Sequence, residues 1–201
     1  MPEWSGSKAA GPSVYSLPTP SGGHASTSSV PTGEPAISYT SVLLAVVVGI
    51  VHAGLSPVIE IGGVRPNLAL VGVVLVTTQL GFGTGIVWAF VAGLTANLLV
   101  LDPLGSVPLS LLLVAALVAG GDRLLGRLVW VYPIIAALAG SVLADLVSLG
   151  VLRLIDAPLQ VGVPFDLIVP AAVLNAALVG VLLYPARIAT ARLRPDERAA
   201  W

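Results

Sequence analysis

The sequence predicts an all-α integral membrane protein, folded as a bundle of six transmembrane helices. Of its 201 residues, 56% are hydrophobic and only 9% are charged, whereas a soluble domain carries about 25% charged residues. The mean hydropathy is +0.99. Between Arg65 and Gly126, three apolar stretches follow one another closely, and nearly all their polar residues fall at the joins. A soluble domain cannot bury so much continuous apolar surface, so we expect this segment to lie in lipid.

Six apolar segments are candidates for crossing a hydrocarbon core of about 30 Å. We expect the spans at residues 37–59, 66–80, 82–101, 107–121, 128–152 and 164–189. The second and fourth are short, since fifteen residues at 1.5 Å each reach only about 22 Å. Such spans thin the bilayer locally or line a cavity that longer neighbours shield.

Prolines and glycines mark the expected ends of these spans. Pro66 and Pro164 suit the first turn of a helix, where a missing N–H costs little. Turns are expected at Asp102-Pro103-Leu104-Gly105 and at Gly120-Gly121-Asp122. The membrane domain then covers residues 37–189, which leaves too few residues for a self-contained soluble catalytic domain.

The two tails differ from the membrane domain and from each other. Residues 1–36 are rich in Ser, Gly, Pro and Thr and poor in large aliphatic side chains. Such a segment cannot bury enough apolar surface to fold, so we expect it to be disordered, and it lacks the features of a secretory signal. Residues 190–201 form a short basic tail.

Arginines predict the orientation in the membrane. An even number of spans places both termini on one side, together with Arg123, Arg127, Arg187, Arg192, Arg194 and Arg198. Only Arg65 and Arg153 then lie on the other side. Because basic residues near span ends favour the cytoplasm, we expect both termini of this multi-pass protein to be cytoplasmic.

The composition argues against several kinds of function. The formal net charge of −1 gives no general attraction for nucleic acid, and without cysteine no disulfide, zinc ribbon or thiol nucleophile exists. Ser56 and Ser141 lie near glycines, as in intramembrane serine proteases, but no second histidine within a span accompanies His52 as a base. We therefore expect no enzyme, with no catalytic residue, no metal site and no cofactor.

Small residues recur at every fourth position in three spans, so each row lies on one helical face. The rows are Ala45, Gly49 and Ala53 in the first span, Gly81, Gly85, Ala89, Gly93 and Asn97 in the third, and Ala136, Gly140, Ala144 and Ser148 in the fifth. Such faces allow close helix packing in lipid. They either hold this bundle together or, most plausibly in the first span, face a separate membrane partner.

Five polar residues lie within or at the start of apolar spans and are expected towards the outer side or the middle of the membrane. They are His52, Asn67, Asn97, Asp145 and Asn175. One interpretation is that they converge on an outward-facing polar site, because intramembrane charges often mark function. The other, which we favour, is an internal hydrogen-bond network that fixes helix register. Asp145 would then be protonated, or paired with His52 or Arg153.

Several short motifs resemble the rod shape-determining MreD family. Pro66-Asn67-Leu68 opens an aliphatic span, and Phe90-Val91-Ala92-Gly93-Leu94 resembles the glycine-rich helix of the family. The turn Pro103-Leu104-Gly105 follows, as in the family, and Pro170 and Asn175 match its last span, before a basic tail. Asn67 and Asn97 stand where the family commonly has aspartate. Asparagine keeps the hydrogen-bonding shape of aspartate but removes its charge.

The resemblance implies a non-catalytic scaffold of the cell-wall elongation machinery (the elongasome). It implies direct binding of MreC and, through that complex, links to RodA, a class B penicillin-binding protein and MreB. It also implies a fold similar to the substrate-binding subunits of energy-coupling-factor vitamin transporters. Such a transporter subunit is the alternative function, since Ala45, Gly49 and Ala53 resemble the face that those subunits offer to their coupling partner.

Overall fold

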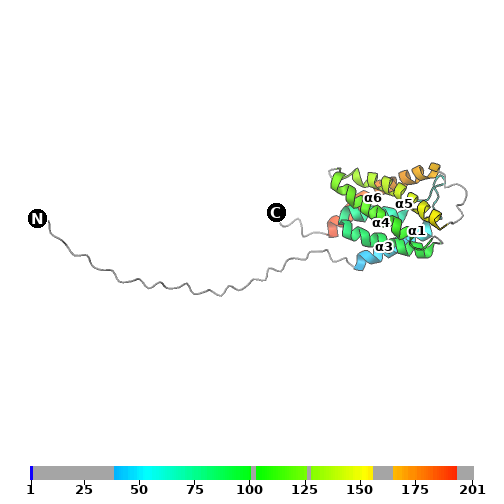
Figure 1. Cartoon of the computed structure of the whole chain (residues 1–201), viewed down its shortest axis with the longest axis horizontal. Coiled ribbons are helices and arrows are strands. Elements are labelled where there is room, and N and C mark those ends of the chain that lie inside the picture. The colour runs from blue at the N-terminus through cyan, green and yellow to red at the C-terminus, as the bar shows by residue number, and fades with distance from the viewer. Residues whose placement is uncertain (2–38, 101–102, 126–127, 156–164, 194–201) are drawn as a thin grey trace. The chain divides into compact units, whose positions relative to one another are not determined.

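Six helices make up the part of the chain that the computed structural model describes, namely residue 1 and residues 39–100, 103–125, 128–155 and 165–193 (Figure 1). They are α1 (Tyr39–Leu55), α2 (Leu68–Leu80), α3 (Phe82–Leu99), α4 (Ser106–Leu125), α5 (Tyr132–Leu154) and α6 (Phe165–Leu193). The chain divides into two units, Met1–Ala36 and Ile37–Trp201, and all six helices belong to the second. Most of the tail predicted to be disordered and the end of the basic tail lie outside the described residues.

The predicted all-α membrane class is confirmed. Four of these helices, α3 to α6, are long and apolar enough to cross a membrane. The other two are apolar but shorter, with 17 residues in α1 and 13 in α2. At 1.5 Å per residue, α2 is only about 20 Å long. The count of six membrane crossings therefore stays a prediction.

Two glycines with positive φ mark tight connections between helices. Gly81, at φ +91°, is the single residue between α2 and α3, and Gly105, at φ +93°, closes the turn before α4. Side chains disfavour this backbone conformation, so glycine suits both positions. The prediction for Pro66 is wrong by two positions: α2 begins at Leu68, capped by Asn67, whose side-chain oxygen accepts the N–H of Leu70 at 3.0 Å. Pro164 lies outside the described residues.

The predicted turn at Gly120-Gly121-Asp122 is also wrong, because α4 continues through it to Leu125. The 20 residues of α4 make it a full-length candidate span rather than a short one. The reason lies on the neighbouring helix. A Cβ on Gly121 would lie 2.9 Å from the hydroxyl oxygen of Tyr132, and that hydroxyl donates to the carbonyl of Val118. Gly121 thus makes room for a side chain of α5.

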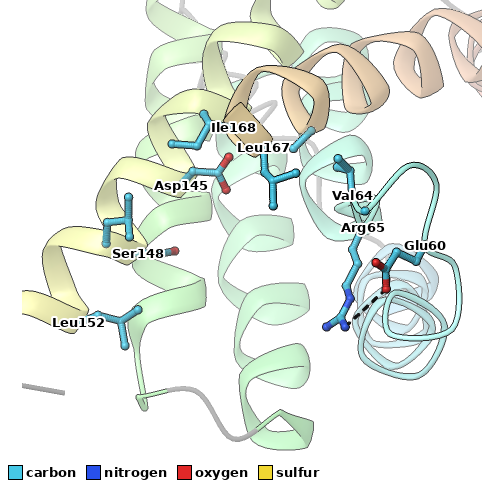
Figure 2. Close-up of a pocket in the computed structure, with 11 residues that line it drawn as sticks. Glu60, Val64, Arg65, Asp145, Ser148, Leu152, Leu167 and Ile168 are labelled. Atoms are coloured by element: carbon cyan, nitrogen blue, oxygen red, sulfur yellow. Dashed lines mark ion pairs between the residues drawn. The ribbon is translucent and has the colours of Figure 1, made fainter. Parts of the chain in front are cut away.

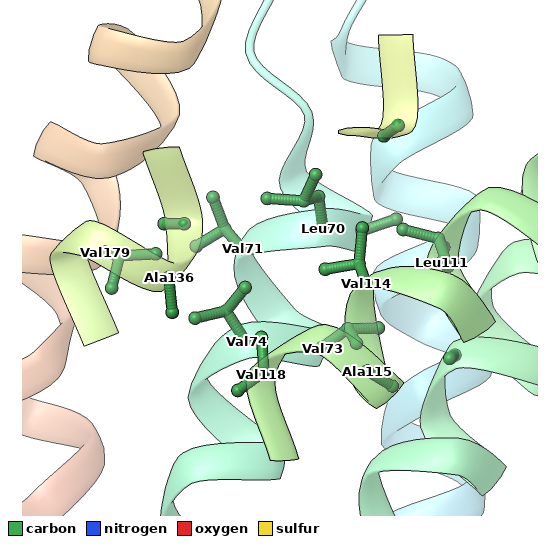
Figure 3. Close-up of a cluster of buried hydrophobic side chains, with 14 of the residues drawn as sticks. Leu70, Val71, Val73, Val74, Leu111, Val114, Ala115, Val118, Ala136 and Val179 are labelled. Atoms are coloured by element: carbon green, nitrogen blue, oxygen red, sulfur yellow. The ribbon is translucent and has the colours of Figure 1, made fainter. Parts of the chain in front are cut away.

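The short helix α2 lies at the centre of the bundle and contacts all five other helices. Around it, contacts run in the order α1, α3, α4, α5, α6. Figure 3 shows α2 side chains surrounded by those of α4, α5 and α6. The largest buried cluster includes Leu70, Val71, Val73 and Val74 of α2, Leu111, Val114, Ala115 and Val118 of α4, and Ala136 and Val179 of α5 and α6. Because lipid is as apolar as these side chains, close packing rather than water exclusion holds the bundle together.

Small residues lie where the helices approach most closely. A Cβ on Gly93 of α3 would lie 2.7 Å from the Cα of Pro108 in α4. A Cβ on Gly85 would lie 2.9 Å from the Cβ of Thr77 in α2, and one on Gly140 would lie 2.9 Å from Val114. These rows of the third and fifth spans therefore pack within the bundle.

The partner-facing interpretation of the first row is wrong for Ala45 and Gly49. Both are buried, and a Cβ on Gly49 would lie 2.7 Å from the carbonyl oxygen of Ala92 in α3. Ala53, one turn further on, is half-buried. Gly81 departs from the third row because it precedes α3, is exposed and has open space around it. Sequence spacing identified the small faces, but it could not reveal what each face meets.

Candidate functional site

Two of the five polar residues join α2 to α6. The backbone N–H of Asn67 donates to Oδ1 of Asn175 at 2.8 Å. The side-chain amide of Asn175 in turn donates to the hydroxyl of Ser141 in α5 at 2.9 Å. Both Asn175 and Ser141 are buried. This network fixes the mutual register of three helices, as expected for buried polar groups that satisfy one another.

Asn97 stabilises the turn between α3 and α4. Its Oδ1 accepts the N–H of Gly105 at 2.6 Å, and its Nδ2 donates to the carbonyl of Pro103 at 3.3 Å. The Oγ of Ser106 donates to the same carbonyl at 2.8 Å. The Pro103-Leu104-Gly105 turn is thus tied to the end of α3. An amide performs this task because it both donates and accepts, which a carboxylate cannot.

The predicted convergence of all five polar residues on one site does not occur. His52 is half-buried on α1, and α1 contacts only α2 and α3 among the described helices. It therefore lies apart from Asp145 on α5 and Asn175 on α6. Depth along a span says nothing about the direction in which a side chain points around its helix. Instead, Asn67 and Asn175 share a hydrogen-bond network, Asn97 holds a turn, and Asp145 lines a pocket.

An open pocket of about 370 Å³ lies where the α1–α2 loop meets α5 and α6 (Figure 2). Its polar lining comes from Glu60 and Arg65 of the loop and Asp145 and Ser148 of α5. Its apolar lining is Val64, Leu149, Leu152, Leu167, Ile168 and Ala171, with Gly63 completing the wall. Figure 2 shows Asp145 and Ser148 on one side and the Arg65–Glu60 pair across from them.

Asp145 has no counter-ion in the part of the chain that the structure describes. There, the ion pair is that of Arg65 Nη2 with Glu60 Oε2 at 3.8 Å. The predicted pairing of Asp145 with His52 or Arg153 is therefore wrong. Its carboxyl also makes no hydrogen bond to another described residue and points into the pocket (Figure 2). A polar group inside a membrane helix that lacks a protein partner is typical of a binding site.

The two serines near glycines have structural partners. The hydroxyl of Ser56 donates to the carbonyl of Pro66 at 3.1 Å, which ties the end of α1 to the residue before the α2 cap. Ser141 accepts from Asn175, as described above. Neither hydroxyl has a histidine base in contact among the interactions of the described residues.

One face of α2 is less covered than the rest, and the sequence analysis did not single it out. Leu68, Leu75 and Gln79 share this face, since they lie seven and four positions apart, and each is only half-buried. We call these three residues the open face of α2. Its position follows from its flanks: Gly72 lies against Val48 of α1, on one side, and Asn67 bonds α6 on the other.

The open face exists because α1 and α6 do not contact each other within the described residues, although both contact α2. The side-chain amide of Gln79 makes no hydrogen bond to another described residue. It is the second amide side chain of the predicted span 66–80, after Asn67 at its start, a signal that could have identified it.

At another point of the surface, Arg187 of α6 anchors the start of α5. Its guanidinium lies 4.1 Å from the ring centroid of Trp130, and Nη2 donates to the carbonyl of Val129. Arginine over tryptophan is a favourable cation–π arrangement, and both residue types are common at membrane interfaces.

Within the described residues, these features define a helical membrane protein with a packed core, a pocket and a partly uncovered face on α2. Residues 35–189 match the family described as rod shape-determining protein MreD, so the chain belongs to the MreD family. This family takes part in determining rod shape and is a structural family rather than a known family of enzymes. No curated protein and no solved structure matches the chain. The vitamin-transporter alternative receives no support from these comparisons.

Proposed function

We propose that this protein is a non-catalytic scaffold of the bacterial cell-wall elongation machinery, and that it binds MreC directly in the inner membrane. Through MreC it is linked to RodA, a class B penicillin-binding protein and MreB. Both tails, residues 1–36 and 190–201, lie in the cytoplasm in this proposal, and the membrane domain crosses the bilayer six times. Membership of the MreD family supports the role in rod shape.

The open face of α2 is the main observation that supports the proposed contact with MreC. A central helix that contacts every other helix is expected to be covered on all sides, yet α1 and α6 leave a strip of it accessible. The strip runs along the helix from Leu68 to Gln79. Its direction and its apolar flanks suit one further helix lying along α2, which is the transmembrane segment that a bitopic MreC would supply.

Gln79 gives this docking surface a polar contact. In hydrocarbon, an amide gains from a hydrogen bond with a neighbouring helix, and such bonds contribute about 1 kcal/mol. The half-buried side chains of Leu68 and Leu75 supply the apolar contact along the same face. Apolar packing together with one interhelical hydrogen bond is a usual basis of helix association in lipid.

The proposal is tested by co-purification of MreC with the full-length protein and by rescue of rod shape in cells depleted of the native protein. Gln79→Leu removes the amide while keeping an apolar surface, and Leu75→Trp fills the strip with a bulky ring. We expect both variants to retain less MreC and to rescue shape poorly. Leu98→Trp is the matched control, because Leu98 is 67% exposed on α3, away from the open face.

Each variant is first checked for normal abundance in the membrane and for a normal thermal unfolding transition. Retention of MreC and full rescue of shape by both Gln79→Leu and Leu75→Trp would show that the open face is not the docking surface. Equal loss in Leu98→Trp would show that bulky substitutions act on the bundle in general.

A further inference from the structure

We propose that the pocket between the α1–α2 loop, α5 and α6 binds the headgroup of an amine-bearing phospholipid, such as phosphatidylethanolamine. The ammonium group lies at Asp145 and the phosphate at Arg65. This lipid site is separate from the open face of α2 and does not depend on the proposed scaffold function.

The charges in the pocket favour a ligand that carries both signs. Asp145 and Glu60 are acids and Arg65 is a base, and all three line the same cavity. Glu60 and Arg65 already pair with each other at 3.8 Å, while more than half of each side chain is exposed. An exposed pair of this kind is weak, so Arg65 remains available for a phosphate. Asp145 remains the acid without a partner among the described residues.

The positions of these charges match the order of groups in the headgroup. Arg65 belongs to the loop that precedes α2, at the end of the bundle. Asp145 belongs to α5 and lines the same cavity as Arg65. A headgroup in this cavity therefore has the base on the loop side for its phosphate and the carboxylate on the α5 side for its amine (Figure 2).

Hydrogen-bond donors distinguish an ethanolamine from other headgroups. A primary ammonium has three N–H donors, and Asp145 together with the hydroxyl of Ser148, which lines the same pocket, supplies acceptors for them. A quaternary choline has no N–H to donate, and a glycerol headgroup has no positive charge. The pocket thus offers more to phosphatidylethanolamine than to either of these lipids.

The apolar wall suits the remainder of the lipid. Leu149, Leu152 and Leu167 line the pocket beside the polar groups. Outside it, Leu146 on α5 and Val169 on α6 are 50% and 64% exposed, so the pocket borders on surface that meets acyl chains. A phospholipid whose headgroup occupies the pocket can lay its own acyl chains along this border, which a soluble ligand cannot do.

Native mass spectrometry of the full-length protein tests the site, with phosphatidylethanolamine, phosphatidylcholine and phosphatidylglycerol added in equal amounts. We expect one phosphatidylethanolamine to be retained in preference to the other two. Asp145→Asn should retain it about tenfold less, because the charge-assisted hydrogen bond is lost. Arg65→Gln, a change in an exposed loop that leaves the helices intact, should also weaken retention.

Matched controls are Asp122→Asn and Arg153→Gln, which change exposed charges that do not line the pocket; both should bind like the wild type. Equal retention of all three lipids, or unchanged retention by Asp145→Asn and Arg65→Gln, would overturn the proposal. Full displacement by soluble glycerophosphoethanolamine at equal concentration would also overturn it. So would loss of MreC from Asp145→Asn with lipid retention unchanged, because the carboxylate would then receive a basic side chain of the partner.

Discussion

The backbone N–H of Asn67 donates to the side-chain oxygen of Asn175 across 108 positions of sequence, at 2.8 Å. Asn67 caps α2 with its own side chain, so one residue both begins the central helix and ties it to α6. Asn175 passes the connection on to Ser141 of α5. The bond also holds α6 at one side of α2, which sets one edge of the open face.

Replacing Asn175 with leucine should destabilise the bundle. Two hydrogen bonds are lost, and the N–H of Asn67 and the hydroxyl of Ser141 are left without these partners. Leaving such groups unsatisfied costs about 1–3 kcal/mol each in buried positions. Thermal unfolding in detergent should show a clearly lower midpoint for Asn175→Leu, whereas Val173→Leu, at a position 53% exposed on the same helix, should unfold like the wild type.

Gly93→Ala should destabilise the protein, and a larger residue such as leucine should do so more. The new Cβ would lie 2.7 Å from the Cα of Pro108, and a backbone atom cannot move aside as a flexible side chain does. Overpacking of this kind costs about 1–3 kcal/mol. Gly120→Ala is the matched control, because a Cβ there meets nothing within 4 Å. A normal unfolding midpoint for Gly93→Ala would contradict the packing described between α3 and α4.

Tyr132→Phe should lower the stability by about 1 kcal/mol, the typical contribution of one intramolecular hydrogen bond. The lost bond is that of the Tyr132 hydroxyl to the carbonyl of Val118 in α4. Tyr184→Phe should be neutral, since Tyr184 is 65% exposed. The two variants change the same chemical group, so denaturant unfolding of both isolates the contribution of this contact between α4 and α5.

Accessibility of single cysteines should reveal the orientation, which is convenient because the natural sequence has none. Ile61→Cys and Leu104→Cys lie in the loops before α2 and before α4, and should react with a membrane-impermeant maleimide in intact spheroplasts. Leu124→Cys at the end of α4 and Phe82→Cys at the start of α3 should react only after permeabilisation. The opposite pattern would invert the proposed topology, and labelling of all four from outside would exclude six crossings.

The helices could be predicted from the sequence because each apolar helix is visible in it as a continuous run of apolar residues. Prediction failed where a local pattern depends on a distant neighbour. Gly120-Gly121 is a strong turn signal by itself, yet the pair stays helical because Tyr132 of the next helix fills the space that Gly121 leaves. The small faces of α1 and α3 were identified by spacing, but spacing does not say that Gly49 faces Ala92.

The functional surfaces were less predictable for a related reason. Depth in the membrane follows from position along a predicted span, and for Asn67, Asn175 and Asp145 it stays a prediction. The direction around each helix depends on its neighbours, and an almost uniformly apolar helix such as α2 gives little sign of which face is covered. Gln79 was missed because a single amide does not indicate a contact surface by itself. It does so only once its helix is known to be central and partly uncovered.

Site-specific photo-crosslinking in living cells tests the central claim most directly. A photoreactive amino acid is placed at Gln79 on the open face or at Leu98 on the outer surface of α3, and adducts with MreC are detected. The account predicts an adduct that includes the transmembrane segment of MreC from Gln79, with none from Leu98. An adduct from Leu98 alone, or equal adducts from both positions, would contradict docking of the partner helix between α1 and α6.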